Sequence, residues 1–231
     1  MAERPIFIPA PDSPRLVLEK MIEFVWNPGL APIQKKKNVL ALHQSAADLG
    51  IAPILECSTK SEEVLGQRLS AFNLKVETDL NGTITLECAF QGSKIFQNGG
   101  PFTDLFHVDS REAKKDQRLK DSGRLIGFRF EGQDFPIIPQ TAFYDWLFIK
   151  SLFPHREYLK RLERYAAFSD IEFNPERSIN CQARSAALFS SLQTRDLLEE
   201  CVKSPLRFIE IRSADLFPRA ETTSGAQERL F

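Results

Sequence analysis

Histidine and cysteine are scarce in this sequence, which has three histidines and four cysteines in 231 residues. The cysteines lie far apart and form no C-x-x-C pair, the spacing that zinc sites and redox centres commonly use. The histidines are equally scattered. We therefore expect no metal site, no cofactor and no disulfide, and we expect reduced, buried thiols at Cys57, Cys88, Cys181 and Cys201.

Long apolar runs are also lacking. No stretch approaches the ~20 apolar residues that a membrane span requires. The opening MAERPIFIPAPDSPR has no basic segment followed by a long apolar one, as a secretory signal would. These absences predict a cytoplasmic protein with no membrane partner.

An excess of charge of one sign is missing too, because 30 Lys and Arg face 31 Asp and Glu and leave a net charge of -1. No global field would recruit nucleic acid, so such a contact needs a local patch or a pocket for one modified base. The only dense basic cluster is QKKKN at Gln34–Asn38. It is either a solvated helix end or a patch that faces a pyrophosphate or a DNA backbone.

Phenylalanine, in contrast, is abundant, with 19 residues in the chain. Because Phe needs no hydrogen-bond partner when it is buried, we expect most of these rings in the core. The length suits one large domain. We expect an α+β domain over residues 1–218, with a small sheet of hairpins surrounded by helices, and a disordered tail over residues 219–231.

Local patterns place the elements of this fold. Asn81-Gly82 and Glu131-Gly132 separate strand-like runs and predict two β-hairpins. Periodic apolar positions with capping and stop residues predict helices, and the chain after His155 is expected to be mostly helical. The expected strands are Leu16–Trp26, Ile51–Cys57, Lys75–Leu80, Thr83–Leu86, Leu125–Phe130 and Asp134–Ile138; the expected helices are Gln34–Leu49, Asp109 or Ser110 to Lys120, and Thr141–Phe153.

Two polar features beside these elements have alternative interpretations. His43 lies next to the apolar stripe of the first helix, where it is either a core residue or a ligand. Ser58 or Ser61 caps a helix that begins at Glu62, the usual role of such residues, or lines a phosphate site together with Lys60.

The stretch ECAFQGSK follows the first hairpin and has the pattern of a helix. Glu87, Phe90, Gln91 and Lys94 fall at i, i+3, i+4 and i+7, so they share one helical face. The opposite face carries small or apolar residues that suit packing. Such a helix would point a carboxylate, a ring, an amide and an amine into one cavity, whereas the alternative is a solvated polar face. Pairing about the hairpin turn would also bring Asn73 to the same end of the sheet as Glu87.

Several motifs, taken in order, resemble the NADAR family. LSAFNL at Leu69–Leu74 is similar to its serine-rich turn, ECAFQGSK to its E-x-x-x-Q-x-x-K helix, AKKDQR to its A-K element and FYDWLFI to its Trp-bearing helix. GGPFTDL also fits, and the likeness extends from IFIP to the SINCQARSAALF run near Ser178–Phe189. Ala71 replaces the usual Asn of the turn, and the family's acidic-Trp-Gly ending is missing, which favours a divergent branch. The resemblance is closest to the antitoxins encoded beside DarT toxins.

The resemblance implies an N-glycosyl hydrolase that removes ADP-ribose from guanine bases in single-stranded DNA, with RNA as the alternative polymer. Such a protein would act in phage defence as the antitoxin of a DarT-type toxin, its genetic and physical partner, and would release ADP-ribose. Two alternatives stay open. The chain is an N-glycosidase for phosphoribosyl-amine intermediates of riboflavin synthesis, or it is a non-catalytic antitoxin that binds its partner.

Breaking a bond between an anomeric carbon and nitrogen needs assistance to the leaving group, stabilisation of a cationic sugar and donors for phosphate. The resemblance makes Glu87 the first carboxylate and Asp145 a second acidic candidate. Lys94 either holds a phosphate or attacks the anomeric carbon as an amine to form an imine. Trp146 is either a stacking platform or a core residue. The substrate-binding candidates are Ser70, Phe72, Asn73, Phe90, Gln91, Asp104, Lys114 and Trp146.

Overall fold

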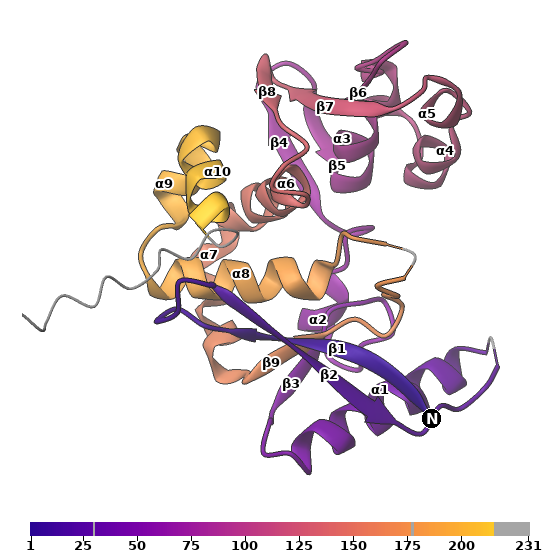
Figure 1. Ribbon diagram of the computed structural model, residues 1–231, viewed down its shortest axis with the longest axis vertical. Helices are drawn as coiled ribbons and strands as arrows, with labels where there is room; N and C mark the ends of the chain where they lie inside the picture. Colours follow the sequence, from indigo (N-terminus) through magenta and orange to yellow (C-terminus); the bar gives the residue numbers. More distant parts are fainter. Residues whose placement is uncertain (30, 177, 215–231) are drawn as a thin grey trace, which may run out of the picture.

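A computed structural model describes residues 1–29, 31–176 and 178–214, and it confirms the α+β class. Two groups of strands and helices lie at opposite ends of the view in Figure 1, and helix α6 runs between them. The predicted tail at 219–231 lies outside the described residues. No helix among the described residues is long and apolar enough to cross a lipid bilayer.

The larger sheet has four strands in the order β2-β1-β9-β3. Its long antiparallel pair, β1 and β2, is in register from Ala2↔Phe24 to Pro9↔Val17, and β9 pairs antiparallel with β1 and parallel with β3. Successive residues of a strand face opposite sides of its sheet. Ile6 accordingly packs against α1, whereas its neighbour Phe7 belongs to the main core with α8. The bounds are β1 Ala2–Pro9, β2 Val17–Phe24, α1 Pro32–Ala47, β3 Ile54–Glu56, β9 Ala167–Ser169 and α8 Gln182–Thr194.

The other group of elements is built from the two predicted hairpins, which are both confirmed. β4 and β5 pair from Lys75↔Thr85 to Thr78↔Gly82, and β7 and β8 turn at Glu131 and Gly132, whose φ angles are 49 and 77°. Positive φ at both positions gives the tight turn that matches strand twist. The bounds are β4 Lys75–Thr78, β5 Gly82–Thr85, α3 Leu86–Gly92, β6 Lys94–Phe96, α4 Ser110–Lys115, α5 Arg118–Asp121, β7 Leu125–Phe130 and β8 Gln133–Phe135.

Helix α6 (Ala142–Leu152) lies at the centre of the molecule, and every residue in it except Lys150 is buried. The ring of Phe143 lies 4.6 Å from that of Phe128 and 4.8 Å from that of Phe135, so phenylalanine forms much of the core, as predicted. Helices α9 and α10 pack against α6 (Figure 1). The remaining bounds are α2 Val64–Arg68, α7 Arg156–Leu159, α9 Leu198–Lys203, α10 Pro205–Ala214 and short 3₁₀ turns at Thr103–His107, Phe153–His155 and Lys160–Arg164.

Several local predictions need correction. The helix expected to run from Asp109 or Ser110 to Lys120 is divided into α4 and α5, because Asp116 adopts an extended ψ of 128° and accepts a bond from the Arg118 amide. Asp109 does cap α4 as predicted, by accepting a 2.8 Å bond from the Arg111 amide. Thr141 does not cap α6, since its hydroxyl donates to Asp145 instead.

The strand β1 has no clear signal in the sequence. Pro5 and Pro9 lie within it although it is flanked by strands on both sides, and proline cannot donate to a β-ladder. The pairing tolerates them because β9 covers only Ile6 and Phe7 of this strand.

Candidate active site

The hairpin β4–β5 delivers the chain directly into α3, whose seven residues are all buried. Thr85 caps the helix by accepting a 3.3 Å bond from the Cys88 amide. The predicted helix to Lys94 is wrong at its end: α3 stops at Gly92, and Lys94 begins strand β6. Gly92 lies where a Cβ would come within 2.6 Å of the Phe106 ring, so only glycine fits there without movement.

The predicted polar residues are nevertheless brought together. The Gln91 amide nitrogen donates to Glu87 Oε1 over 2.8 Å, and Lys94 Nζ donates to Gln91 Oε1 over 2.7 Å. The same Lys94 nitrogen lies 4.8 Å from the centre of the Phe90 ring. Glu87 and Gln91 are buried, so the alternative of a solvated polar face is wrong. We call the residues Glu87, Phe90, Gln91 and Lys94 the α3 cluster.

The amine of the α3 cluster has an unusual electrostatic environment. Burial lowers the pKa of Lys94; the charge on Glu87 opposes this effect, and the charge on Lys114 adds to it. Such a shift makes the neutral, nucleophilic form of a lysine more accessible near neutral pH.

Phe90 and Lys94 line a cavity of about 680 Å³, within the range of small-molecule sites. Its walls come from β7, from the segment after β8 and from the stretch that precedes α8. Polar groups of the lining are Lys94, Gln140, Glu176, Ser178 and Asn180, and the apolar ones are Phe90, Leu125, Phe128, Ile137, Ile138, Pro175 and Ile179. A lining that combines apolar side chains with two amides and a hydroxyl suits a ligand that has both rings and hydroxyl groups.

The sequence does not predict the part of this cavity that precedes α8. The stretch from Pro175 to Asn180 has no periodic pattern, and only its place in the fold brings it opposite Lys94. The sequence also does not indicate Tyr144, whose ring meets Phe90 edge to face at 5.4 Å. Burial raises the pKa of Tyr144 well above its usual value, and among the charged groups Glu87 adds most to this shift. The residues around Tyr144 are apolar, so the sequence predicts a core helix there and does not indicate a site residue.

The LSAFNL turn lies beside this site, held by α8. Gln182 Oε1 accepts a 2.7 Å bond from the Ala71 amide, and Gln182 also bonds to the buried Asp170. Ser70 is buried, and its hydroxyl has no hydrogen-bond partner among the described residues. Phe72 is exposed instead, and Lys114 Nζ lies 5.8 Å from its ring centre.

The backbone of Asn73 lies in register with that of Glu87, since Lys75 pairs with Thr85 and the Leu86 amide bonds to the Leu74 carbonyl. The two residues therefore share one end of the hairpin, as predicted. The Asn73 side chain, however, donates to the Gln67 carbonyl over 2.9 Å and lines a different cavity.

Three further predicted site residues also lie outside the α3 cluster. Asp145 is buried in an ion pair with Arg184, at 2.9 Å, and accepts a 2.6 Å bond from Ser185. Trp146 is buried, and its indole N–H donates to the Cys201 carbonyl, so the structure places it in the core rather than at a stacking face. Asp104 is exposed and pairs with Arg118 on α5.

His43 and Ser58 belong to a buried network at the end of β3. Glu56 accepts bonds from Ser58 at 2.5 Å and from Ser169 at 2.7 Å, and Ser169 in turn contacts His43 Nε2 at 2.8 Å. Burial lowers the pKa of His43 to about 4. His43 is thus a core residue, and neither Ser58 nor Ser61 caps α2, which begins after Glu63 without a side-chain cap. Both serines are buried rather than aligned along an open phosphate site.

The basic cluster at Gln34–Asn38 lies in the first turns of α1, and part of it is occupied. Lys35 pairs with Glu172 at 3.3 Å, and its amine lies 5.8 Å from the Trp26 ring centre. Asn38 is buried and accepts a 2.6 Å bond from the Asn27 amide. Lys36 and Lys37 lie on this helix without such contacts among the described residues.

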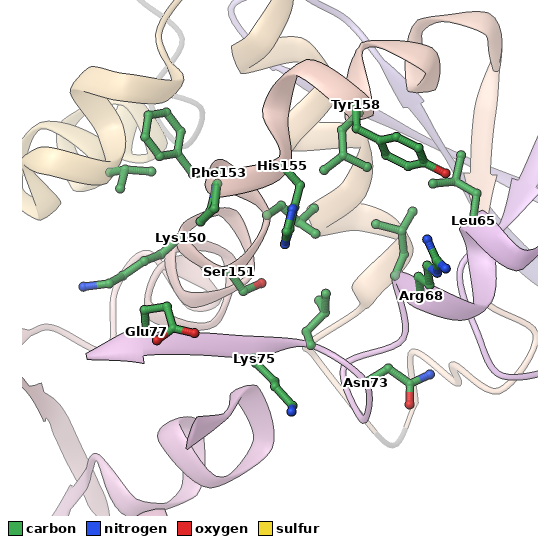
Figure 2. Close-up of a pocket in the computed structure, with 16 residues that line it drawn as sticks. Leu65, Arg68, Asn73, Lys75, Glu77, Lys150, Ser151, Phe153, His155 and Tyr158 are labelled. Atoms are coloured by element: carbon green, nitrogen blue, oxygen red, sulfur yellow. The ribbon is translucent and has the colours of Figure 1, made fainter. Parts of the chain in front are cut away.

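A second cavity, of about 810 Å³, lies between α2, β4 and the C-terminal end of α6. Figure 2 shows Arg68 and Asn73 at one side of it, Lys150 and Glu77 at the other, and His155 and Ser151 between them. Its floor is apolar, with Leu65, Leu69, Leu74, Leu152, Leu159 and Val202. We call this cavity the α2–α6 groove.

No group of three or more His, Cys, Asp or Glu side chains in the described part of the chain is arranged to hold a metal ion. All four cysteines are free and buried, as predicted for structural thiols.

Comparison with known families matches residues 2–221 to the family described as DarT1-associated NADAR antitoxin. No curated protein matches the sequence. The family match covers both cavities and the whole of the α3 cluster.

Proposed function

Because this chain belongs to the family of DarT1-associated NADAR antitoxins, we propose that it removes ADP-ribose from guanine bases in single-stranded DNA. In this proposal it is an N-glycosyl hydrolase, and it protects a cell that makes the toxin by repairing the toxin's product. The observation that carries the proposal is the hydrogen-bonded series Glu87–Gln91–Lys94, whose amine end lines a cavity of about 680 Å³.

Lys94 is the nucleophile in this proposal. Its amine attacks the anomeric carbon of the ribose, the carbon–nitrogen bond to guanine breaks, and its electron pair leaves with the guanine nitrogen, which takes a proton. The sugar ring opens, and the amine nitrogen, having lost its protons, is left in an imine. Water then adds to the imine and restores the lysine, so the net reaction consumes one water and yields guanine and ADP-ribose. The pKa of Lys94, lowered by burial, supports this role.

Glu87 stabilises the positive charge that develops on the sugar, as carboxylates do at other glycosidic centres. Its oxygen Oε1 is held by Gln91, so its position is fixed before the substrate arrives. The Phe90 ring forms the apolar wall against which the ribose packs. Lys114, close enough to affect Lys94, is the donor for the pyrophosphate.

The proposal is tested by incubating the protein with single-stranded DNA that carries ADP-ribosylated guanine, and by following the loss of the adduct. We expect rapid removal by the native chain and at least a ~100-fold loss for Glu87→Gln and Lys94→Ala. Lys20→Ala, an exposed lysine on β2, serves as the matched control for removing one lysine. Borohydride added during turnover should attach ADP-ribose to Lys94, detected by peptide mass spectrometry.

Two other results would redirect the assignment. If the adduct survives with folded native protein but small phosphoribosyl-amines are cleaved, the chain is a metabolite hydrolase. If neither is cleaved and the protein forms a stable complex with the toxin that Glu87→Gln does not weaken, it is a binding antitoxin.

A further inference from the structure

We propose that the α2–α6 groove binds the single-stranded nucleic acid next to the modified base. This inference rests on the proposed function, and it gives a role to a cavity that the α3 cluster does not use. The groove, at about 810 Å³, has the size of a ligand site and combines an apolar floor with a cationic rim.

The cations of the groove lie where a phosphate backbone can reach them. Arg68 closes helix α2 and Lys75 opens strand β4, and both side chains are exposed. Neither forms an ion pair with another described residue. Since the chain has a net charge of -1, such unpaired cations at one cavity are a local anion site rather than part of a basic surface.

The acidic residues near the groove are already engaged. Glu77 accepts one bifurcated hydrogen bond from the Thr83 hydroxyl, at 2.8 Å to Oε1 and 2.7 Å to Oε2, and it keeps its charge. Glu131 pairs with Lys150 at 2.6 Å. Arg68 and Lys75 outnumber Glu77, the one carboxylate of the lining, so the rim is positive. A positive rim attracts any anion, and it favours a polyanion over a small acidic metabolite because each phosphate contact adds to the binding of a strand.

An aromatic platform stands beside these cations. Tyr158 lines the groove with 44% of its surface exposed, and the guanidinium carbon of Arg161 lies 3.5 Å from its ring centre. One face of the ring is thus backed by a cation, and Figure 2 shows the side chain at the edge of the cavity, above Arg68. Exposed rings of this kind stack unpaired bases without regard to sequence.

A continuous path joins the groove to the α3 cluster. Asn73 lines the groove, and its neighbour Phe72 is exposed beneath Lys114, at 5.8 Å. Lys114 is in turn close enough to lower the pKa of Lys94. In this proposal, a strand whose modified guanine enters the cavity at Lys94 passes the exposed Phe72 and places its next nucleotides over Arg68 and Lys75. A protein partner would have to fill the apolar floor, whereas a strand needs only the rim and the ring.

The test measures binding of unmodified single-stranded oligonucleotides by fluorescence anisotropy, with DNA and RNA of one sequence as separate arms. The variant Arg68→Ala/Lys75→Ala removes both rim cations, and Lys20→Ala/Lys120→Ala removes two exposed charges elsewhere. We expect the rim variant to weaken binding and to reduce the slope of log K against log salt by about 1.4, which is ~0.7 for each phosphate contact. Tyr158→Ala should weaken binding about tenfold.

Unmodified strands need no catalysis, so this test is independent of the proposed function. Loss of affinity in the rim variant but not in its control supports the groove as a strand site even if no adduct is removed. Equal affinity and equal salt slope in both variants, with both folded, overturns it. Loss of toxin binding in the rim variant, without any loss of oligonucleotide binding, overturns it as well and assigns the groove to the toxin.

Discussion

Lys94 Nζ donates a hydrogen bond of 2.7 Å to Gln91 Oε1, and this amide stands between the amine and the Glu87 carboxylate. A direct ion pair with Glu87 would hold the lysine protonated, because an opposite charge in contact favours the charged form. The neutral Gln91 amide orients the Lys94 amine and holds the Glu87 carboxylate nearby, without a direct ion pair between the two. The cluster therefore holds an amine and a carboxylate, the proposed nucleophile and the proposed cation-stabilising group, within the short stretch from Glu87 to Lys94.

Replacing the amide should change the protonation of Lys94. We expect Gln91→Glu to raise the pKa of Lys94 by putting a carboxylate within 2.7 Å of the amine, and Glu87→Gln to lower it by removing a charge that now raises it. The measurement is the pH dependence of Lys94 acetylation by acetic anhydride, followed by peptide mass spectrometry, with Lys20 as an exposed internal reference. Equal titration in all three proteins would contradict the electrostatic coupling of the cluster.

Asp145 should matter for stability rather than for chemistry. Its carboxylate is buried against the half-buried Arg184 at 2.9 Å and the buried Arg212 at 3.6 Å, so Asp145→Asn removes the negative charge that both guanidinium groups face there. Breaking a buried pair in this way costs about 3–5 kcal/mol of unfolding free energy. Denaturant unfolding checks this, with Asp134→Asn, which breaks an exposed pair, as the control that should barely change. A stable Asp145→Asn protein that had lost only turnover would instead make Asp145 catalytic.

A substitution at Trp146 can distinguish a core role of this ring from a stacking role. Trp146→Phe keeps a ring but removes the indole donor to the buried Cys201 carbonyl, so we expect a loss of about 1–3 kcal/mol in unfolding free energy. The KM for an ADP-ribosylated oligonucleotide should stay unchanged, because the structure keeps the ring away from either cavity. A raised KM with unchanged stability would restore the stacking role.

Much of the fold follows from signals that act over a few residues. Gly82 has a φ of 64°, and Glu131 and Gly132 have φ of 49 and 77°; glycine adopts such angles readily, so a glycine between two strand-like runs makes both hairpins predictable. The arrangement of Glu87, Gln91 and Lys94 survives the early end of α3, since Lys94, the first residue of β6, still donates to Gln91.

The rest of the site depends on contacts between distant segments. Nothing near Asn180 in the sequence indicates that it faces Lys94, and Tyr144 is hidden within an apolar helix. Trp146 and Asp145 share that helix, so the motif that places them near the site also allows them to point into the core. Sequence order sets which residues are close along the chain, whereas packing decides which of them reach a cavity.

The buried network at Glu56 should make stability depend on pH. Burial raises the pKa of Glu56 from its ordinary 4.5 to about 8, with Asp170 adding to the effect, so the folded state holds a proton that the unfolded state has released. A raised folded pKa gives stability that is fully present below pH 4.5 and is lost as the pH rises through 8.

Two neighbouring groups, His43 and Asp170, change the unfolding free energy at lower pH. The pKa of His43, lowered from 6.5 to about 4, gives the opposite slope between those values, because there the unfolded state binds the extra proton. Burial raises the pKa of Asp170 from 3.8 to about 6, so its contribution to the unfolding free energy is lost as the pH rises through 6. Glu56 is therefore the member of this network that acts alone from about pH 6.5 to about pH 8.

In that window the unfolding free energy should fall by up to about 1.4 kcal/mol for each pH unit, the limit for one proton. Glu56→Gln keeps the side-chain size and an acceptor for Ser58 and Ser169 but cannot ionise, so its unfolding free energy should be flat there. Urea unfolding at pH 6.5, 7.2 and 8.0 compares the two proteins, and Glu62→Gln, an exposed carboxylate, should keep the native slope. If native protein and Glu56→Gln show equal slopes, Glu56 is ionised in the folded state, and the hydrogen bonds from Ser58, Ser169 and the Ile171 amide outweigh its burial.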